Sequence, residues 1–162
     1  MNLILGTANF CNDYGKRIDK DGCFRILDRA NELGIRTVAT AFDYGYQVVS
    51  EYGWKDILHK YKPGLITWNG VDGVSIDEYK YVEEGLIMAP FNPIDLRFYA
   101  YASDNRFIAR SIFCGGKLQR SNKEDIARLV FGFLKSHFVK NSVFGVESVE
   151  ELELIVRVAN EK

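Results

Sequence analysis

The stretch Ile26–Gly45, "ILDRANELGIRTVATAFDYG", shows the succession of elements that indicates the fold class. Its first half completes a run of apolar residues at helical spacing, Cys23–Leu33, and Gly34 follows as a helix end because glycine adopts the left-handed conformation without steric penalty. Its second half holds Arg36–Ala39, an apolar run of strand length, and then a loop with a Tyr-Gly pair. The stretch therefore predicts a helix, a strand and a loop in direct succession.

The same alternation of short apolar runs and helical patterns continues along the chain. The predicted strands are Leu3–Leu5, Arg36–Ala39, Gly64–Thr67, Leu86–Ala89, Phe107–Ser111 and Ser142–Gly145. Alternating strands and helices imply a parallel sheet covered by helices, so we expect one α/β domain over residues 1–162 with about six strands. An eight-stranded (β/α) barrel typically needs ~250 residues. A complete barrel is therefore not expected.

Two further helices have clear patterns. In Lys123–Phe138 the predicted buried residues follow helical spacing, with Ser121 or Asn122 as N-cap; they are Ile126, Leu129, Val130, Phe133 and Leu134. The last helix opens with a capping box, Ser148 and Glu151, followed by an apolar stripe of Leu152, Ile155, Val156 and Ala159. Weaker patterns predict helices over Gln47–Tyr61 and Ile76–Glu84. The segment Pro93–Asn105 is ambiguous.

Composition and charge exclude several classes of function. The 162 residues are 47% hydrophobic and 14% aromatic, which indicates a packed globule. Lys and Arg number 21 against 22 Asp and Glu, so no basic excess indicates a nucleic-acid partner. No apolar stretch approaches the ~18 residues of a membrane helix, and no signal peptide is expected. We therefore predict a cytoplasmic protein.

The cysteines and histidines do not indicate a metal site. Cys11, Cys23 and Cys114 form no paired motif, so neither a disulfide framework nor a zinc ribbon is expected, and the thiols are predicted to be reduced. His59 and His137 each lie in a helical pattern without a second ligand one turn away. Structural or surface roles are predicted for both histidines.

Several stretches together resemble the aldo-keto reductases, whose fold is the (β/α)8 barrel. "LILGTANFCNDYGK" is similar to that family's first strand and loop, and "ILDRANELGIRTVATAFDYG" to its first helix, second strand and tyrosine-bearing loop. "MAPFNPIDLRF", "IARSIFCGGKL" and "SVFGVESVEELELI" resemble the sixth, seventh and eighth strand regions. The sixth-strand segment is closest in character to members linked to bacterial surface-polysaccharide synthesis. The resemblance implies a shortened, TIM-barrel-like sheet.

The middle of the chain departs from the family pattern. "KPGLIT" is similar to the third strand, but "WNGVDGVSIDEY" then leads almost directly to the sixth-strand segment. Material that corresponds to the fourth strand and its flanking helices is absent from the sequence, in agreement with the count of about six strands.

The resemblance implies hydride transfer from NADPH to a carbonyl, with Tyr44 at the position of the proton-donating tyrosine. In the family an aspartate and a lysine tune that tyrosine, whose pKa is ordinarily about 10, and a histidine orients the substrate. Here Ala39 stands at the aspartate position and Trp68 at the lysine position, and the histidine-bearing strand has no counterpart. Asp43, Lys55 or Lys62 could compensate, although surface roles are favoured for all three.

The cofactor regions match the family more fully. The resemblance places Ser111, Gly115, Gly116 and Leu118 in one dinucleotide-binding loop, and Gly145, Glu147, Ser148 and Glu151 at the start of the last helix. Glycines permit close backbone approach, and a helix N-terminus offers N–H groups to phosphate. Against NADPH, Glu147 and Glu150 would repel a phosphate, and the capping box explains Ser148 and Glu151 without a ligand.

Two functional hypotheses follow. The favoured one is a degenerate aldo-keto-reductase-like protein without standard reductase activity, which acts by ligand binding or assembly, with a second copy or another protein covering sheet edges left by the missing strands. The alternative is an NADPH-dependent carbonyl reductase of a sugar-like substrate, with Tyr44 as proton donor. Different chemistry on the same scaffold stays open.

Overall fold

The chain divides into two compact units. The computed structural model describes residues 1–11, 17–42, 44–59, 65–67, 85–116 and 122–161. The first unit, called here the terminal unit, comprises Leu3–Tyr61 and Phe144–Lys162. The second, called the central unit, comprises Met1–Asn2 and Lys62–Val143. Each unit is an α/β arrangement, and each is described by itself.

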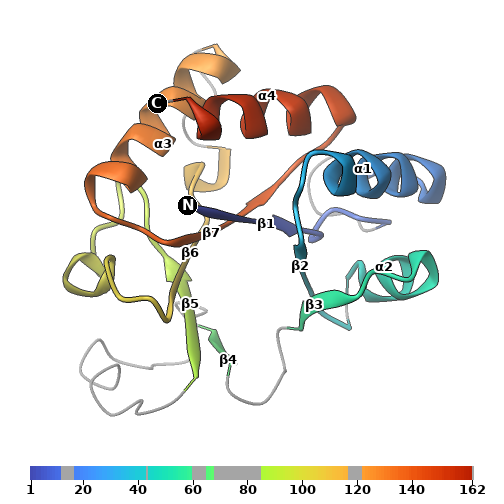
Figure 1. Ribbon diagram of the computed structural model, residues 1–162, viewed down its shortest axis with the longest axis horizontal. Helices are drawn as coiled ribbons and strands as arrows, with labels where there is room; N and C mark the ends of the chain where they lie inside the picture. The colour runs from blue at the N-terminus through green and yellow to red at the C-terminus, as the bar shows by residue number, and fades with distance from the viewer. Residues whose placement is uncertain (12–16, 43, 60–64, 68–84, 117–121, 162) are drawn as a thin grey trace. The chain divides into compact units, whose positions relative to one another are not determined.

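The terminal unit is built on three parallel strands in the order β3-β2-β1 (Figure 1). They are β1 (Asn2–Gly6), β2 (Thr37–Thr40) and β3 (Asp56–His59). The register places Ala39 of β2 beside Gly6 on one side and beside Leu58 on the other. Each crossover contains a helix, α1 (Lys20–Glu32) before β2 and α2 (Tyr46–Tyr52) before β3, as parallel strands require. The predicted α/β class with parallel strands is confirmed.

Helix α1 follows its sequence signals closely. Asp19 is the N-cap, and its side chain accepts a hydrogen bond from the Gly22 N–H at 2.7 Å. At the other end Gly34 adopts φ +83°, and the N–H groups of Gly34 and Ile35 donate to the carbonyls of Asn31 and Ala30. This is a complete Schellman motif, so Gly34 ends the helix as the sequence predicts. The buried face consists of Gly22, Cys23, Ile26, Leu27 and Ala30.

The predicted helix over Gln47–Tyr61 is wrong beyond Tyr52. Gly53 adopts φ +81°, and its N–H donates to the Ser50 carbonyl while the next N–H closes on Val49. A left-handed residue at this position ends the helix, because the chain leaves the helical path there. Asp56–His59 then form β3, which pairs with β2, and Lys60 and Tyr61 lie outside the described residues. Seven strands therefore lie within the described residues, where the sequence predicted about six.

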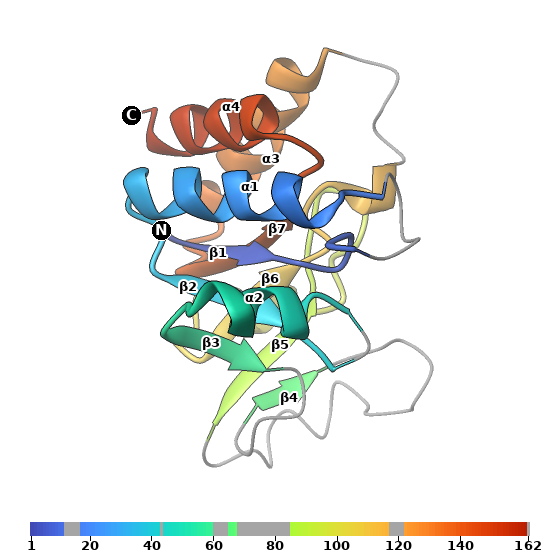
Figure 2. The same cartoon turned by 90° about the vertical axis from the view of Figure 1, so that its right-hand side faces the viewer.

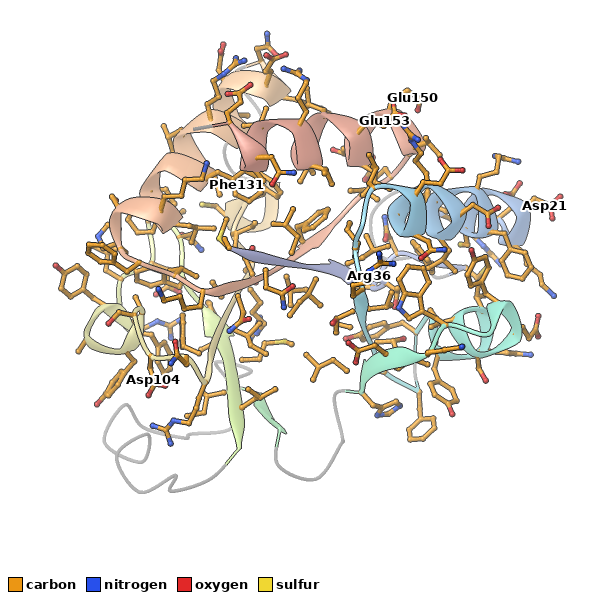
Figure 3. All side chains as sticks on the ribbon, in the orientation of Figure 1. Asp21, Arg36, Asp104, Phe131, Glu150 and Glu153 are labelled. Atoms are coloured by element: carbon orange, nitrogen blue, oxygen red, sulfur yellow. The ribbon has the colours of Figure 1, made fainter. Side chains whose placement is uncertain are left out.

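Helix α4 (Val149–Asn160) packs beside α1, as Figures 1 and 2 show from two directions. The predicted apolar stripe of α4 is buried, and it consists of Leu152, Ile155, Val156 and Ala159. Across the two helices the Arg29 guanidinium contacts the Glu153 carboxylate at 2.7 Å (Figure 3 labels Glu153). Such exposed pairs contribute little to stability, so burial of the two apolar faces holds the helices together.

The central unit contains four parallel strands in the order β7-β6-β5-β4. Strand β4 spans Leu65–Thr67, β5 spans Leu86–Pro90, β6 spans Phe107–Arg110 and β7 spans Asn141–Gly145. The ambiguous segment between β5 and β6 forms turns and a single 3-10 turn, η2 (Tyr99–Tyr101), in place of a crossover helix. A second 3-10 turn, η3 (Cys114–Gly116), precedes α3 (Lys123–Ser136). The helix predicted at Ile76–Glu84 lies outside the described residues.

The buried face of α3 is only partly the predicted one. Asn122 is the N-cap, as expected, and the predicted Val130 and Leu134 are buried, but Ala127 and Phe131 complete the buried face. Phe131 is fully buried in the central unit (Figure 3), whereas Leu129 is 54% exposed. The sequence contains two overlapping apolar stripes at helical spacing, and the sheet beneath the helix selects one of them. The second stripe, Ile126, Leu129 and Phe133, is left half-buried or exposed.

No helix within the described part of the chain is long and apolar enough to cross a membrane.

Candidate functional site

Ala39 lies near the carboxyl end of β2, at the position where the resemblance predicts that the family's aspartate is missing. Ala39 is 8% exposed there. Its carbonyl accepts hydrogen bonds from the Thr7 N–H at 3.1 Å and from Thr7 Oγ1 at 3.2 Å. The methyl side chain of Ala39 can neither ionise nor accept a hydrogen bond. The backbone contacts thus fix the end of β2 against the residue that follows β1, but Ala39 supplies no group to tune an acid.

Tyr44 follows this strand end in a tightly bonded loop. Its carbonyl accepts hydrogen bonds from Thr40 Oγ1 at 2.9 Å and from the Ala41 N–H at 3.4 Å, and its own N–H donates to the Ala41 carbonyl at 3.1 Å. The next residue, Gly45, adopts φ +65° and is the N-cap of α2. A Cβ atom there would lie 2.3 Å from Thr7 Oγ1, so only glycine fits. The backbone of Tyr44 and Gly45 is therefore held by contacts with Ala41 and Thr7, and the Tyr44 side chain is half-buried.

Of the residues that could compensate for the missing aspartate, lysine and histidine, only Lys55 is among the described residues. Lys55 is exposed in the connection between α2 and β3. Asp43, Lys62 and Trp68 lie outside the described residues. The resemblance compares "KPGLIT" with the family's third strand. In the structure β3 pairs with β2, whereas Leu65–Thr67, as β4, pairs with β5.

An aromatic cluster at the ends of β2 and β3 was not predicted from the sequence. His59 is the last residue of β3 and lies beside Thr40 in the register. Its ring centroid is 4.1 Å from that of Phe42 and 5.1 Å from that of Tyr46. The erroneous helix over Gln47–Tyr61 concealed His59, because a helix places it away from the β2 loop. Recognition of Gly53 as a helix end would have revealed its place.

Asn9 is a second polar residue that the sequence analysis did not single out. It is 7% exposed, and its Nδ2 donates to the Val146 carbonyl at 2.6 Å. Its Oδ1 is buried without a hydrogen-bond partner. This contact connects the segment after β1 with the segment after β7. A sequence pattern does not predict it, because the two residues come together only in the tertiary structure.

The central unit carries one half of the expected cofactor site. Ser111 is exposed with φ +52°, and its carbonyl accepts hydrogen bonds from Asn92 Nδ2 and the Cys114 N–H, each at 2.9 Å. Gly115 is also exposed and left-handed, with φ +59°, and Gly116 ends the same 3-10 turn. Leu118 lies outside the described residues.

Among the described residues, Arg110 is a cation beside this loop that the sequence did not single out. Arg110 Nη1 donates to Ser111 Oγ at 3.2 Å. Its place as the last residue of β6, directly before the expected cofactor loop, is the signal that could have identified it. A guanidinium there offers donors to an anionic ligand.

The terminal unit carries the other half, at the start of α4, where the helix caps itself. Ser148 Oγ accepts the Glu151 N–H at 3.2 Å, and the Glu151 carboxylate accepts the Glu147 N–H at 2.7 Å. A hydrogen bond from Ser148 lowers the pKa of Glu150, aided by the Glu150 N–H. The predicted capping box is confirmed, although Glu151 reaches the N–H one residue before the cap. Gly145 is exposed, and a Cβ there would meet only ordinary contact.

Carboxylates thus occupy the helix terminus that a phosphate would otherwise use. The N–H groups of Glu147 and Glu151 already have partners, and three acidic side chains, those of Glu147, Glu150 and Glu151, surround them. An additional anion would meet like charge and few remaining donors. Within the described ranges, no cluster of three His, Cys, Asp or Glu side chains is arranged to hold a metal ion.

Comparison with solved structures identifies the fold. Two structures, both provisionally assigned as aldo-keto reductases from Pseudomonas aeruginosa, match with TM-scores of 0.69 and 0.63. Each match covers 98% of this chain and 89% of the other, at 15% sequence identity. The chain has an aldo-keto-reductase-like fold. This likeness confirms the predicted class, a shortened barrel-like α/β arrangement. No protein-family profile matches the sequence, and no curated protein matches it.

Proposed function

We propose that this chain is a degenerate aldo-keto-reductase-like protein that acts by ligand binding or assembly, without standard reductase activity. The observation that carries the proposal is Ala39, a buried methyl group on β2 just ahead of the Tyr44 loop. A tyrosine near its ordinary pKa of about 10 is a weak acid at neutral pH, so its catalytic use requires tuning groups. Ala39 supplies none. The Tyr44 loop is then a retained structural feature.

The self-capped start of α4 supports weak affinity for NADPH. The carboxylates of Glu150 and Glu151 lie in the first turn, where the helix dipole favours negative charge, and they satisfy it within the chain. A phosphate that bound at this helix terminus would have to displace these carboxylates, and the helix would then lose its cap. Arg110 and the left-handed residues Ser111, Cys114 and Gly115 favour a smaller anionic or polar ligand at the loop after β6.

The second apolar stripe of α3 supports assembly. Leu129 is 54% exposed, and Phe133 lies one turn further along the same side of the helix. The Phe133 ring contacts the His137 ring at a tilt, and His137 meets Tyr99 edge-on at 5.3 Å between ring centroids. Tyr99 and Phe138 are themselves 61% and 69% exposed. Apolar side chains of this size gathered around one helix are typical of an interaction surface, which a second copy or another protein would cover.

The alternative function is NADPH-dependent reduction of a carbonyl on a sugar-like substrate. The hydrogen bonds of the Tyr44 backbone favour it, with Tyr44 as proton donor and His59 at the same end of the strands. The link to surface-polysaccharide synthesis rests on the resemblance of the "MAPFNPIDLRF" segment.

A cofactor titration separates the two functions. NADPH fluorescence is followed as protein is added, and NADPH consumption is then measured with a panel of aldoses and simple aldehydes. The favoured function predicts no saturable binding in the micromolar range and no turnover above the protein-free rate. Turnover that Tyr44→Phe abolishes, and that the matched control Tyr46→Phe leaves intact, would establish the alternative.

Light scattering after gel filtration tests assembly. We expect a mass above that of one chain, and dissociation in Leu129→Glu. Arg128→Gln is the matched control, because it changes the net charge by the same amount at an exposed neighbour on the same helix. A monomeric parent protein, or equal effects of the two substitutions, would contradict the role of the α3 stripe.

A further inference from the structure

Two cysteine thiols lie close together in the terminal unit. Cys11 follows β1 and is exposed, whereas Cys23 lies on the buried face of α1 with 0% of its surface accessible. Their Sγ atoms are 3.9 Å apart. All three cysteines lie within the described residues, and none is in a disulfide. Twelve positions separate Cys11 from Cys23 in the sequence, so the tertiary fold and not a local motif brings the two sulfurs together.

The backbone of Ile18 holds the two thiols in this arrangement. The Cys11 N–H donates to the Ile18 carbonyl at 3.1 Å, and the Cys23 Sγ lies 3.8 Å from the same oxygen. Cys23 is also fixed by α1, since its N–H donates to the Asp19 carbonyl at 2.9 Å. Cys11 adopts φ +50°, a left-handed conformation that is unfavourable for a residue with a side chain. Its position is therefore imposed by the surroundings.

We propose that Cys11 and Cys23 form a modification site, a dithiol that hydroperoxides oxidise to a reversible disulfide within the chain. The site combines one solvent-accessible sulfur, which an oxidant can reach, with one buried sulfur at contact distance, which can resolve the first oxidation product. This inference is independent of the proposed function, because it needs neither a nucleotide nor a carbonyl substrate.

The chemistry balances with hydrogen peroxide as the oxidant. The Cys11 thiolate attacks one peroxide oxygen, an S–O bond forms, the O–O bond breaks, and the departing hydroxide takes up a proton to become water. The Cys23 sulfur then attacks the Cys11 sulfur, forms the S–S bond and expels the oxygen as a second water, which carries away the Cys23 proton. The two thiols lose two electrons in total, and the peroxide gains them. A thiol reductant reverses the reaction.

Burial assigns the order of the two steps. Desolvation, together with the neighbouring Cys11, raises the pKa of the Cys23 thiol to about 12. Cys23 thus stays protonated at neutral pH and is a poor first nucleophile. The resolving step should accelerate as pH rises, because the thiolate fraction of Cys23 grows with pH.

Peptide mapping of the oxidised chain tests the proposal. The protein is treated with a few equivalents of hydrogen peroxide, the remaining thiols are alkylated, and the digest is analysed by mass spectrometry. We expect a crosslinked pair of peptides joining Cys11 to Cys23, a mass loss of two hydrogen atoms, and full reversal by dithiothreitol. Cys11→Ser and Cys23→Ala should abolish the crosslink. Cys114→Ser, the matched control in the central unit, should not.

A pH series on the unsubstituted chain keeps the test independent of how the variants fold. Cys11 is first converted to a mixed disulfide with a small aromatic thiol, and release of that thiol by Cys23 is followed at pH 7 to 10. Release that rises with pH supports the proposal. Irreversible oxidation of Cys11 to the sulfinic acid with Cys23 intact would overturn it, as would crosslinks only between chains or only to Cys114.

Discussion

Replacing Gly45 by alanine should destabilise the protein far more than any other single methyl addition at a described loop glycine of the terminal unit. Gly45 has φ +65°, between Tyr44 and the first residue of α2. An added Cβ would lie 2.3 Å from Thr7 Oγ1, 2.7 Å from Thr7 Cβ and 2.8 Å from the Thr7 carbonyl oxygen. Real Cβ atoms do not approach other atoms so closely, so β1 and the Tyr44 loop must separate.

The magnitude follows from two contributions. A left-handed conformation costs an L-residue about 1–2 kcal/mol. Forcing a methyl group into a packed site costs about 1–3 kcal/mol more. The reduced entropy of the unfolded alanine chain offsets at most about 1 kcal/mol of this. Gly45→Ala should therefore lower the free energy of unfolding by about 2–4 kcal/mol, a large share of the about 5–15 kcal/mol typical of a domain.

Gly53→Ala is the matched control. Gly53 has φ +81°, but nothing lies within 4 Å of the added Cβ. Only the conformational strain applies, so the loss should be about 1 kcal/mol. Urea denaturation followed by far-ultraviolet circular dichroism and by tryptophan fluorescence measures both losses, and coincident transitions justify the two-state treatment.

The comparison of the two glycines can refute the reasoning. Equal losses for Gly45→Ala and Gly53→Ala would show that Thr7 does not confine the Tyr44 loop. The double variant Thr7→Ala with Gly45→Ala refines the test, because it removes the Oγ1 contact but leaves the contacts with Cβ and the backbone oxygen. We expect partial rescue, and complete rescue would mean that only the hydroxyl obstructs the methyl group.

Three further predictions concern helix ends and a tyrosine. Phe138 is 69% exposed at φ +56°, so Phe138→Gly should stabilise the protein by about 0.5–1 kcal/mol in urea denaturation, and destabilisation would refute the strain. Ser148→Ala should cost about 1 kcal/mol and Ser148→Asp should not, because the side-chain acceptor for the Glu151 N–H is lost only in the first. Burial and the hydrogen bond to Asp28 raise the pKa of Tyr52 to about 12, so stability should fall between pH 10 and 12, where the unfolded tyrosine ionises and the folded one does not. Tyr52→Phe should remove that loss, as ultraviolet titration and denaturation at each pH would show.

The errors in the sequence-based fold have specific physical causes. The helix over Gln47–Tyr61 was extended too far because apolar residues continue at helical spacing past Gly53, whereas the left-handed glycine stops the helix. That error hid both β3 and the place of His59 at the ends of the strands. The buried face of α3 was only partly predicted because two apolar stripes overlap, and helical periodicity alone cannot rank them.

The candidate site, like the fold, was only partly predicted from the sequence. The resemblance placed Tyr44 and Ala39 in one strand and loop, and the structure confirms that local order. It did not predict Arg110 as the donor to Ser111 Oγ, or the buried amide of Asn9 beyond β1. The Asn9 amide depends on a contact with Val146, which is distant in the sequence, whereas Arg110 directly precedes Ser111 and could have been identified from its place at the end of β6.

The sequence by itself determined the alternation of strands and helices, the end of α1 at Gly34 and the capping box of α4. These features depend on interactions within a few residues, namely backbone conformation and side-chain contacts one turn apart. Only the tertiary structure decided which side of α3 is buried, that β3 pairs with β2, and that the sulfurs of Cys11 and Cys23 meet. Those outcomes depend on packing between elements distant in the chain, where several arrangements satisfy the same local pattern and burial selects among them.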